Sequence, residues 1–185
     1  MERICLGQYR SIDDADECLC HGLTISMSDA ATRLCTNCGL CCNGVLFDLV
    51  RLQPQDSVQQ LTRLGMKLRR KKTQPWFPQP CQFLQSCTCT IYENRPTRCR
   101  LFECQQLKKL HAGQITEQDA LEVIARTKAM VAEVETLLPI DTSTAQSLSL
   151  EERVNASHEE KTSADLKHLH NQLKRLLARE FRVLD

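Results

Sequence analysis

The sequence predicts a mainly α-helical protein whose middle is an irregular, cysteine-rich core with one internal helix, followed by C-terminal helical segments. Three observations predict this class. Nine of the twelve cysteines lie between Cys35 and Cys104, aromatic residues are few (one Trp, two Tyr and five Phe), and two long helical patterns follow Cys104 in a stretch without cysteine. Because so few large apolar side chains are present, we expect something besides apolar packing to hold the middle together.

The length of 185 residues suits one domain with appendages, since a single hydrophobic core usually serves about 100 to 200 residues. We expect an irregular lead-in over residues 1–34, a cysteine-cluster domain over 35–104 and a helical extension over 105–185. The second boundary lies where the cysteines stop and long helical periodicity begins.

The internal helix is indicated by apolar residues at helical spacing between two groups of cysteines. These residues are Val58, Leu61, Leu64 and Leu68. Asp56 or Ser57 is suited to cap the amino end, because short polar side chains accept hydrogen bonds from the first free N–H groups of a helix. One amphipathic helix therefore separates the two cysteine groups.

The first helix of the extension is predicted over about residues 117–138. Thr116 is a suitable amino-terminal cap, and Pro139 ends the pattern. One broad apolar face runs along this segment and consists of Ala120, Val123, Ile124, Thr127, Val131, Val134 and Leu138. The Ser/Thr-rich residues 141–149 predict a linker after it.

The last helix is predicted over about residues 163–182. Thr162 and Asp165 resemble a capping box at its amino end. Its apolar stripe consists of Leu166, Leu169, Leu173, Leu176, Leu177 and Phe181. We expect this stripe to pack on the 117–138 helix; the alternative is a protein partner or a homodimer formed through the C-terminal helix.

The sequence pattern offers no signal-peptide core and no membrane segment. Charged and polar residues interrupt the first ten positions, and no stretch approaches the roughly 20 apolar residues that a membrane helix needs. We therefore expect a cytoplasmic protein. Because cytosolic thiols are kept reduced, closely spaced cysteines are expected to be metal ligands or catalytic thiols rather than a disulfide framework.

Nucleic-acid binding is not expected. The net charge of +1 gives no global field that would attract an anionic polymer. One basic run stands out and consists of Lys67, Arg69, Arg70, Lys71 and Lys72. We interpret it as a solvated face at the end of the internal helix, where cations interact favourably with the helix dipole.

The first cysteine group indicates metal binding. Cys35, Cys38 and Cys41 follow a C-x2-C-x2-C spacing, at which a tight turn brings thiolates near one ion. Thiolates are soft ligands that suit Zn²⁺, Cu(I) and iron–sulfur clusters, whereas Mg²⁺ and Ca²⁺ prefer oxygen. We therefore expect zinc or iron, and a core stabilised by metal.

Cys42 directly follows Cys41, and adjacent side chains diverge in an extended chain. Either the two thiolates bind different metals or share a bridging arrangement, or one of them is a free thiol beside a cluster. The second cysteine group is Cys81, Cys87, Cys89, Cys99 and Cys104. Eight thiolates would complete two four-cysteine sites, as two zinc sites, one zinc site and one cluster, or two clusters.

Three arginines lie beside the later cysteines. A turn at Asn94–Pro96 is suited to fold these cysteines back toward the first group. Arg95, Arg98 and Arg100 surround Cys99 and are either charge-assisted donors to thiolates or solvated surface residues. All five histidines, His21 included, are interpreted as ordinary. Cys18 and Cys20 have C-x-C spacing and are either additional ligands or redox thiols, or inert, as is Cys5; we favour the inert interpretation.

The cysteine block resembles the CxxCxxCC family in four stretches: CTNCGLCCNG at 35–44, CQFL at 81–84, CTIYENRPTRCRLF at 89–102, and Cys104. The resemblance covers about residues 35–104 and implies a zinc- or iron-chelating domain. It implies eight ligands, which are Cys35, Cys38, Cys41, Cys42, Cys81, Cys89, Cys99 and Cys104. Cys87 is then extra, and Gln82 stands where the family more often has proline.

Three functional hypotheses follow. The first is a cytosolic protein that chelates zinc or iron, as single ions, a binuclear site or an iron–sulfur cluster, and is ordered by the bound metal. The second is an iron–sulfur-dependent oxidoreductase or a lysine N-methylase-like enzyme, because flagellin lysine-N-methylase resembles the family in its cysteine cluster. The third is an interaction module in which the metal cluster is purely structural.

Overall fold

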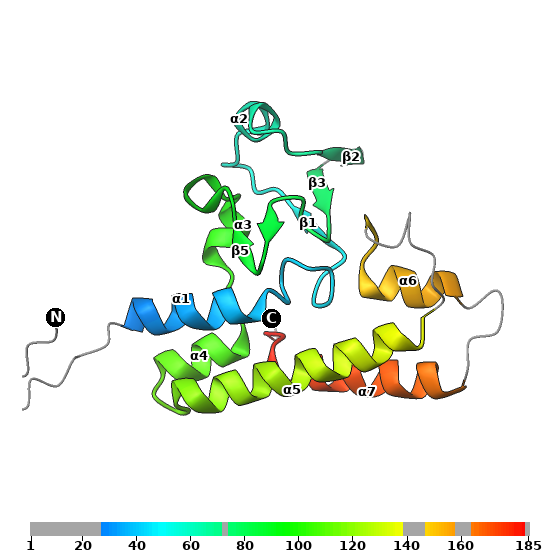
Figure 1. Cartoon of the computed structure of the whole chain (residues 1–185). Coiled ribbons are helices and arrows are strands. Elements are labelled where there is room, and N and C mark those ends of the chain that lie inside the picture. Colours follow the sequence, from blue (N-terminus) through cyan, green and yellow to red (C-terminus); the bar gives the residue numbers. More distant parts are fainter. Residues whose placement is uncertain (1–26, 72–73, 139–146, 158–163, 184–185) are drawn as a thin grey trace, which may run out of the picture.

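The computed structural model describes residues 27–71, 74–138, 147–157 and 164–183, and these are mainly helical, as the sequence predicts (Figure 1). The helices are α1 (Met27–Cys38), α2 (Val58–Arg63), α3 (Thr97–Leu101), α4 (Gln105–His111), α5 (Glu117–Thr136), α6 (Leu150–Ala156) and α7 (Ala164–Glu180), with a 3-10 turn η1 (Tyr92–Asn94). The strands are β1 (Leu49–Arg51), β2 (Arg69–Lys71), β3 (Gln74–Pro78), β4 (Leu84–Gln85) and β5 (Thr88–Cys89). No helix in these ranges is long and apolar enough to cross a membrane.

The elements form two lobes, each with its own apolar core. The helical lobe contains α1, α4, α5, α6 and α7, and its core includes residues from all five helices. The sheet lobe contains β1 to β5, α2, η1 and α3, with a smaller core of Val50, Leu52, Leu61, Met66 and Phe77. In Figure 1 the sheet lobe stands above the layer of α1, α4, α5 and α7.

Helix α5 confirms the helix predicted over residues 117–138, except that the last two predicted positions are not helical. The Thr116 hydroxyl accepts a hydrogen bond from the Asp119 N–H at 3.1 Å, and Asp119 Oδ2 accepts one from the Thr116 N–H at 2.8 Å. This reciprocal capping box satisfies two N–H groups that the helix itself leaves free. The helix ends at Thr136, before Pro139.

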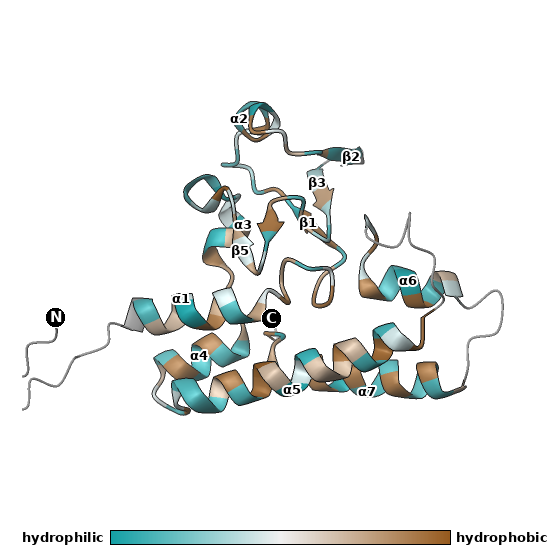
Figure 2. Ribbon diagram, viewed as in Figure 1, coloured by the Kyte–Doolittle hydropathy of each residue, from teal (hydrophilic) through white to brown (hydrophobic). Residues whose placement is uncertain are grey.

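The last helix, α7, packs against α5, which confirms the expected packing of its apolar stripe. Leu166, Leu173, Leu177 and Phe181 are at most 3% exposed. Figure 2 shows apolar residues along both helices where they lie together. The stripe is therefore covered within the chain, while the proposed cap Thr162 lies outside the described residues.

The prediction of an irregular lead-in over residues 1–34 is wrong at its end, because helix α1 occupies residues 27–38. Its apolar residues Ala30 and Leu34 are buried in the helical lobe. Arg33 binds the Glu117 carboxylate with two nitrogens, at 2.7 and 2.6 Å. Met27, Ala30, Ala31 and Leu34 do have helical spacing, but a helix of twelve residues is stable mainly through packing, here against α5. Cys5, Cys18, Cys20 and His21 lie outside the described residues.

Strands β1 to β5 and helix α3 correct the expectation of an irregular core with one internal helix, and two short helices after the cysteine block were not predicted either. Ser149, expected to end a linker, caps α6 and forms a capping box with Glu152. Helix α4 begins directly after Cys104, and its buried Gln106 donates to the Glu180 carbonyl at 2.9 Å. Both helices have seven residues, so their sequence periodicity is too short to recognise.

The three-stranded sheet has the antiparallel order β1-β3-β2. Ser57 caps α2 as predicted, but the helix ends at Arg63 and not near Leu68, because Gly65 turns the chain with a φ of +90°. The basic run therefore does not lie at a helix end. Residues 69–71 form β2, and the Arg69 guanidinium stacks on Trp76 at 5.3 Å from the ring centroid.

A carboxylate fixes helix α3, which carries Cys99. One oxygen of Asp56 accepts hydrogen bonds from the Thr97 N–H at 2.8 Å and the Thr97 hydroxyl at 2.7 Å. The other oxygen accepts from the Gln53 N–H at 2.7 Å. Thr97 is only 6% exposed, so its hydrogen-bonding groups have little access to water. Asp56 thus joins the loop before α2 to the start of α3.

We expect Asp56→Ala to lower the free energy of unfolding by about 2 kcal/mol, because a buried N–H and hydroxyl lose their acceptor. Asp56→Asn keeps an acceptor oxygen and is expected to cost less. Urea denaturation of both variants measures the difference. Equal stability of the wild type and the alanine variant would contradict this role for Asp56.

Candidate metal centre

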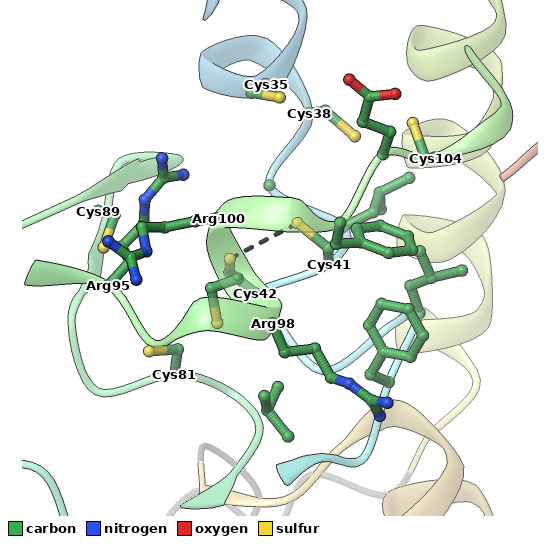
Figure 3. Close-up of a pocket in the computed structure, with 18 of the residues that line it drawn as sticks. Cys35, Cys38, Cys41, Cys42, Cys81, Cys89, Arg95, Arg98, Arg100 and Cys104 are labelled. Carbon is green, nitrogen blue, oxygen red and sulfur yellow. Dashed lines mark hydrogen bonds between the residues drawn. The ribbon is translucent and has the colours of Figure 1, made fainter. Parts of the chain in front are cut away.

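All eight predicted ligands line one pocket of about 1270 Å³. Figure 3 labels all of them except Cys99. Cys35 and Cys38 come from α1, Cys41 and Cys42 from the following turn, Cys81 from the segment after β3, Cys89 from β5, Cys99 from α3, and Cys104 caps α4. Each of these cysteines is a free thiol. The pocket therefore gathers thiols from both lobes.

The first three cysteines do not lie in a single tight turn. Cys35 and Cys38 lie on the last turn of α1, and Gly39 then ends the helix with a φ of +69°. The Gly39 carbonyl accepts from the Cys42 N–H at 2.9 Å, which closes the next turn. The C-x2-C-x2-C spacing thus spans a helix end and the turn after it, and only glycine makes this change of direction without strain.

The thiols are near one another without coordination geometry. Within the ranges that the structure describes, no three His, Cys, Asp or Glu side chains come together closely enough to hold a metal ion. The closest contact is between the Sγ atoms of Cys41 and Cys42, at 3.6 Å. Side-chain rotations that draw the thiols inward are therefore needed to bind a metal.

Burial and mutual repulsion oppose ionisation of most of these thiols. Burial raises the pKa of Cys35 to about 11, and the nearby Cys41 and Cys104 raise it further. Burial likewise raises the pKa of Cys38 to about 12, against the effect of a hydrogen bond from the Leu40 N–H. Cys104 also has a raised pKa through burial, although the Leu107 and Gln106 N–H groups oppose it. These thiols need a cation to become thiolates.

Burial also raises the pKa of cysteines nearer the sheet lobe. Burial raises the pKa of Cys99 to about 12, with smaller contributions from Cys81, Cys41 and Cys89. Burial also raises the pKa of Cys81, partly offset by the Phe83 N–H. The hydrogen bond with Cys41 is the largest cause that raises the pKa of Cys42, and it lowers that of Cys41. Cys41 is therefore the first of this adjacent pair to ionise.

Arg95 acts on several thiols. It lowers the pKa values of Cys35, Cys41 and Cys99, although burial remains the largest influence on Cys35 and Cys99. The Arg95 Nε donates to the Tyr92 carbonyl at 2.9 Å, and its guanidinium lies 3.5 Å from the centroid of the Tyr92 ring. These contacts hold the cation beside the pocket (Figure 3).

The other two arginines of the predicted trio have different surroundings. Arg98 and Arg100 both line the pocket and are exposed. Arg100 donates to the Thr97 hydroxyl at 3.3 Å. Neither arginine contributes to the thiol pKa shifts described above, so Arg95 is the member of the trio that fits the role of a donor to thiolates.

Cys87 lines the same pocket, although the family resemblance leaves it outside the eight. It lies at the tip of the β4–β5 hairpin, where Ser86 and Cys87 both have positive φ, 45° and 63°. Its Sγ is 3.9 Å from the Cys38 carbonyl oxygen, and a Cβ on Gly39 would lie 3.1 Å from that sulfur. Sequence spacing alone gave no signal for this contact between the hairpin and the end of α1.

Gln82, which stands where the family more often has proline, has a structural explanation. Its side chain donates to the Gly65 carbonyl at 2.7 Å and accepts from the Lys67 N–H at 3.1 Å. Both bonds join the segment after Cys81 to the turn that follows α2. The substitution therefore replaces a rigid residue by one that anchors the same segment through hydrogen bonds.

The donor set fits a soft metal. The predicted ligands are all sulfur, and thiolates suit zinc and iron. Buried thiols with raised pKa values become stable thiolates when a cation enters among them. Four thiolates leave a charge of about −2 on one Zn²⁺, and N–H donors and Arg95 are in place to offset it.

Comparison with known proteins gives one match. The model of the CxxCxxCC family, described as a putative zinc- or iron-chelating domain, matches residues 34–133. This is more than half of the chain and extends past Cys104 through α4 into α5. The resemblance was expected to end near Cys104, so this expectation is corrected for residues 105–133. No curated protein and no solved structure matches significantly. The chain belongs to the CxxCxxCC family of zinc- or iron-chelating domains.

Proposed function

We propose that the protein is a cytoplasmic zinc- or iron-binding protein that holds its metal through eight thiolates. The ligands are Cys35, Cys38, Cys41, Cys42, Cys81, Cys89, Cys99 and Cys104. The observation that carries this proposal is the convergence of thiols from both lobes on one pocket. Family membership supports metal binding by the domain.

The proposed metal stabilises the fold. Metal binding converts buried, protonated thiols into thiolates held in one place, and its free energy then adds to the free energy of folding. The ligands join α1, the start of α4, α3 and β5. A bound metal therefore links elements that are far apart in the sequence, at the point where the two lobes meet.

The proposal is chelation, not catalysis, because the pocket's clearest feature is its set of thiols. An iron–sulfur cluster remains within the proposal, since thiolates are its usual ligands. Redox or methyl-transfer chemistry needs a substrate next to that cluster. Nothing among the described residues identifies such a substrate, so chelation is the function that the site supports best.

Metal analysis tests the proposal directly. We expect untagged protein, purified both anaerobically and in air, to contain zinc or iron, with acid-labile sulfide and a visible spectrum if an iron–sulfur cluster is present. The double variant Cys38→Ser/Cys99→Ser should lose the metal, and Cys87→Ser should keep it. Reduced, folded wild-type protein without zinc or iron would refute the proposal.

Arg95→Gln is expected to weaken metal binding about three- to tenfold, because a cation that offsets thiolate charge is lost. Arg95→Lys should retain much of the affinity. Arg98→Gln is the matched control, with unchanged affinity expected. Competition with a chelator at low and high salt measures the effect, which should shrink as salt screens the charge. Equal affinities of the Arg95→Gln and Arg98→Gln variants would contradict this role.

The metal-free protein should lose stability as the pH rises above about 9. The ordinary thiol pKa is 9.0, and the pKa values of Cys38 and Cys99 are about 12 in the folded protein. Between these values the unfolded chain releases protons that the folded chain keeps, so the free energy of unfolding falls with increasing pH. Urea denaturation of reduced, chelator-treated protein at pH 8 and pH 10.5 tests the sign. The metal-loaded form, with thiolates already present, should change less.

A further inference from the structure

The two apolar cores contact different thiols. Three cysteines, Cys38, Cys41 and Cys104, pack against the core of the helical lobe. Two others, Cys81 and Cys99, pack against the core of the sheet lobe. The thiols in the shared pocket therefore divide according to the lobe that holds their backbone.

Two of the remaining thiols also have clear positions. Cys35 precedes Cys38 by one turn on α1 and therefore belongs with the helical lobe. Cys89 lies in the hairpin that follows Cys81, where it is paired with Leu84. The Leu84 N–H donates to the Cys81 carbonyl at 3.0 Å, which holds the hairpin next to Cys81.

Cys42 is tied to the sheet lobe by its backbone. Its carbonyl accepts a hydrogen bond from the Cys81 N–H at 2.7 Å. Cys41, one residue earlier, packs against the other core. In Figure 3, Cys35, Cys38 and Cys104 lie on one side of Cys41, and Cys42 and Cys81 lie on the other side. The boundary between the two groups thus runs between Cys41 and Cys42.

We propose that the eight thiolates form two separate four-thiolate metal centres, one on each lobe. The first centre consists of Cys35, Cys38, Cys41 and Cys104, and the second of Cys42, Cys81, Cys89 and Cys99. This inference rests on the proposed function and adds the number of centres and the ligands of each. The first centre joins α1 to the start of α4, and the second joins the end of β3 and the β4–β5 hairpin to α3.

Single substitutions test the division. Cys38→Ser removes a ligand of the first centre and Cys99→Ser a ligand of the second, so each should halve the metal content of the wild type. Cys87 lines the same pocket but lies outside both centres, so Cys87→Ser should leave the metal content unchanged. Elemental analysis and native mass spectrometry of the full chain measure these contents.

Alkylation of thiols under native conditions identifies which ligands remain bound. In metal-loaded Cys99→Ser we expect rapid labelling of the other three thiols of the second centre and protection of all four thiols of the first. Cys38→Ser should give the converse pattern. Loss of all metal and all protection in either folded variant would indicate one shared cluster and overturn the inference.

Wild-type protein provides a measurement that does not depend on the folding of variants. Stepwise removal of metal by a chelator should expose the thiols to alkylation as two groups with the proposed membership. Exposure of all eight together, or in groups that mix the two sets, would overturn the division alone. A wild-type chain without any metal would refute the proposed function itself.

Discussion

The pocket between the lobes brings together eight candidate ligands, and burial and contacts with other thiols raise the pKa of six of them. Cys38 and Cys99 have pKa values of about 12, mainly through burial. A shared environment of this kind favours the entry of a cation, because one ion can compensate several thiolates at once. Backbone N–H groups at Cys38 and Cys104, together with Arg95, provide part of the compensation from the protein itself.

The topology explains how these thiols meet. Cys35 and Cys38 lie at the end of α1, and Cys104 caps α4, so they project from helix termini where the backbone changes direction. The sheet lobe is built from the chain between Cys42 and Cys104. Its strands and hairpin lead the chain back to the pocket. There the Cys81 N–H donates a hydrogen bond to the Cys42 carbonyl at 2.7 Å, which holds the two segments together.

The two long helices of the helical lobe, α5 and α7, could be predicted from the sequence, because Thr116, Pro139 and the leucines of α7 are strong local signals. Helix α1 was not predicted, because its short apolar pattern does not reveal that it packs against α5 in the folded chain. Eight of the cysteines that line the pocket were expected from spacing and family resemblance, whereas Cys87 was not. The proposed division of these cysteines into two groups could not be predicted, because only the tertiary fold brings Cys104 near the end of α1.

The two lobes differ in how much they depend on the proposed metal. Among the residues that the structure describes, the helical core contains sixteen buried apolar residues and the sheet core five. Small cores of this kind usually need a metal or disulfides. The second centre, which crosses the sheet lobe from Cys42 to Cys99, lies where that additional stabilisation is most needed.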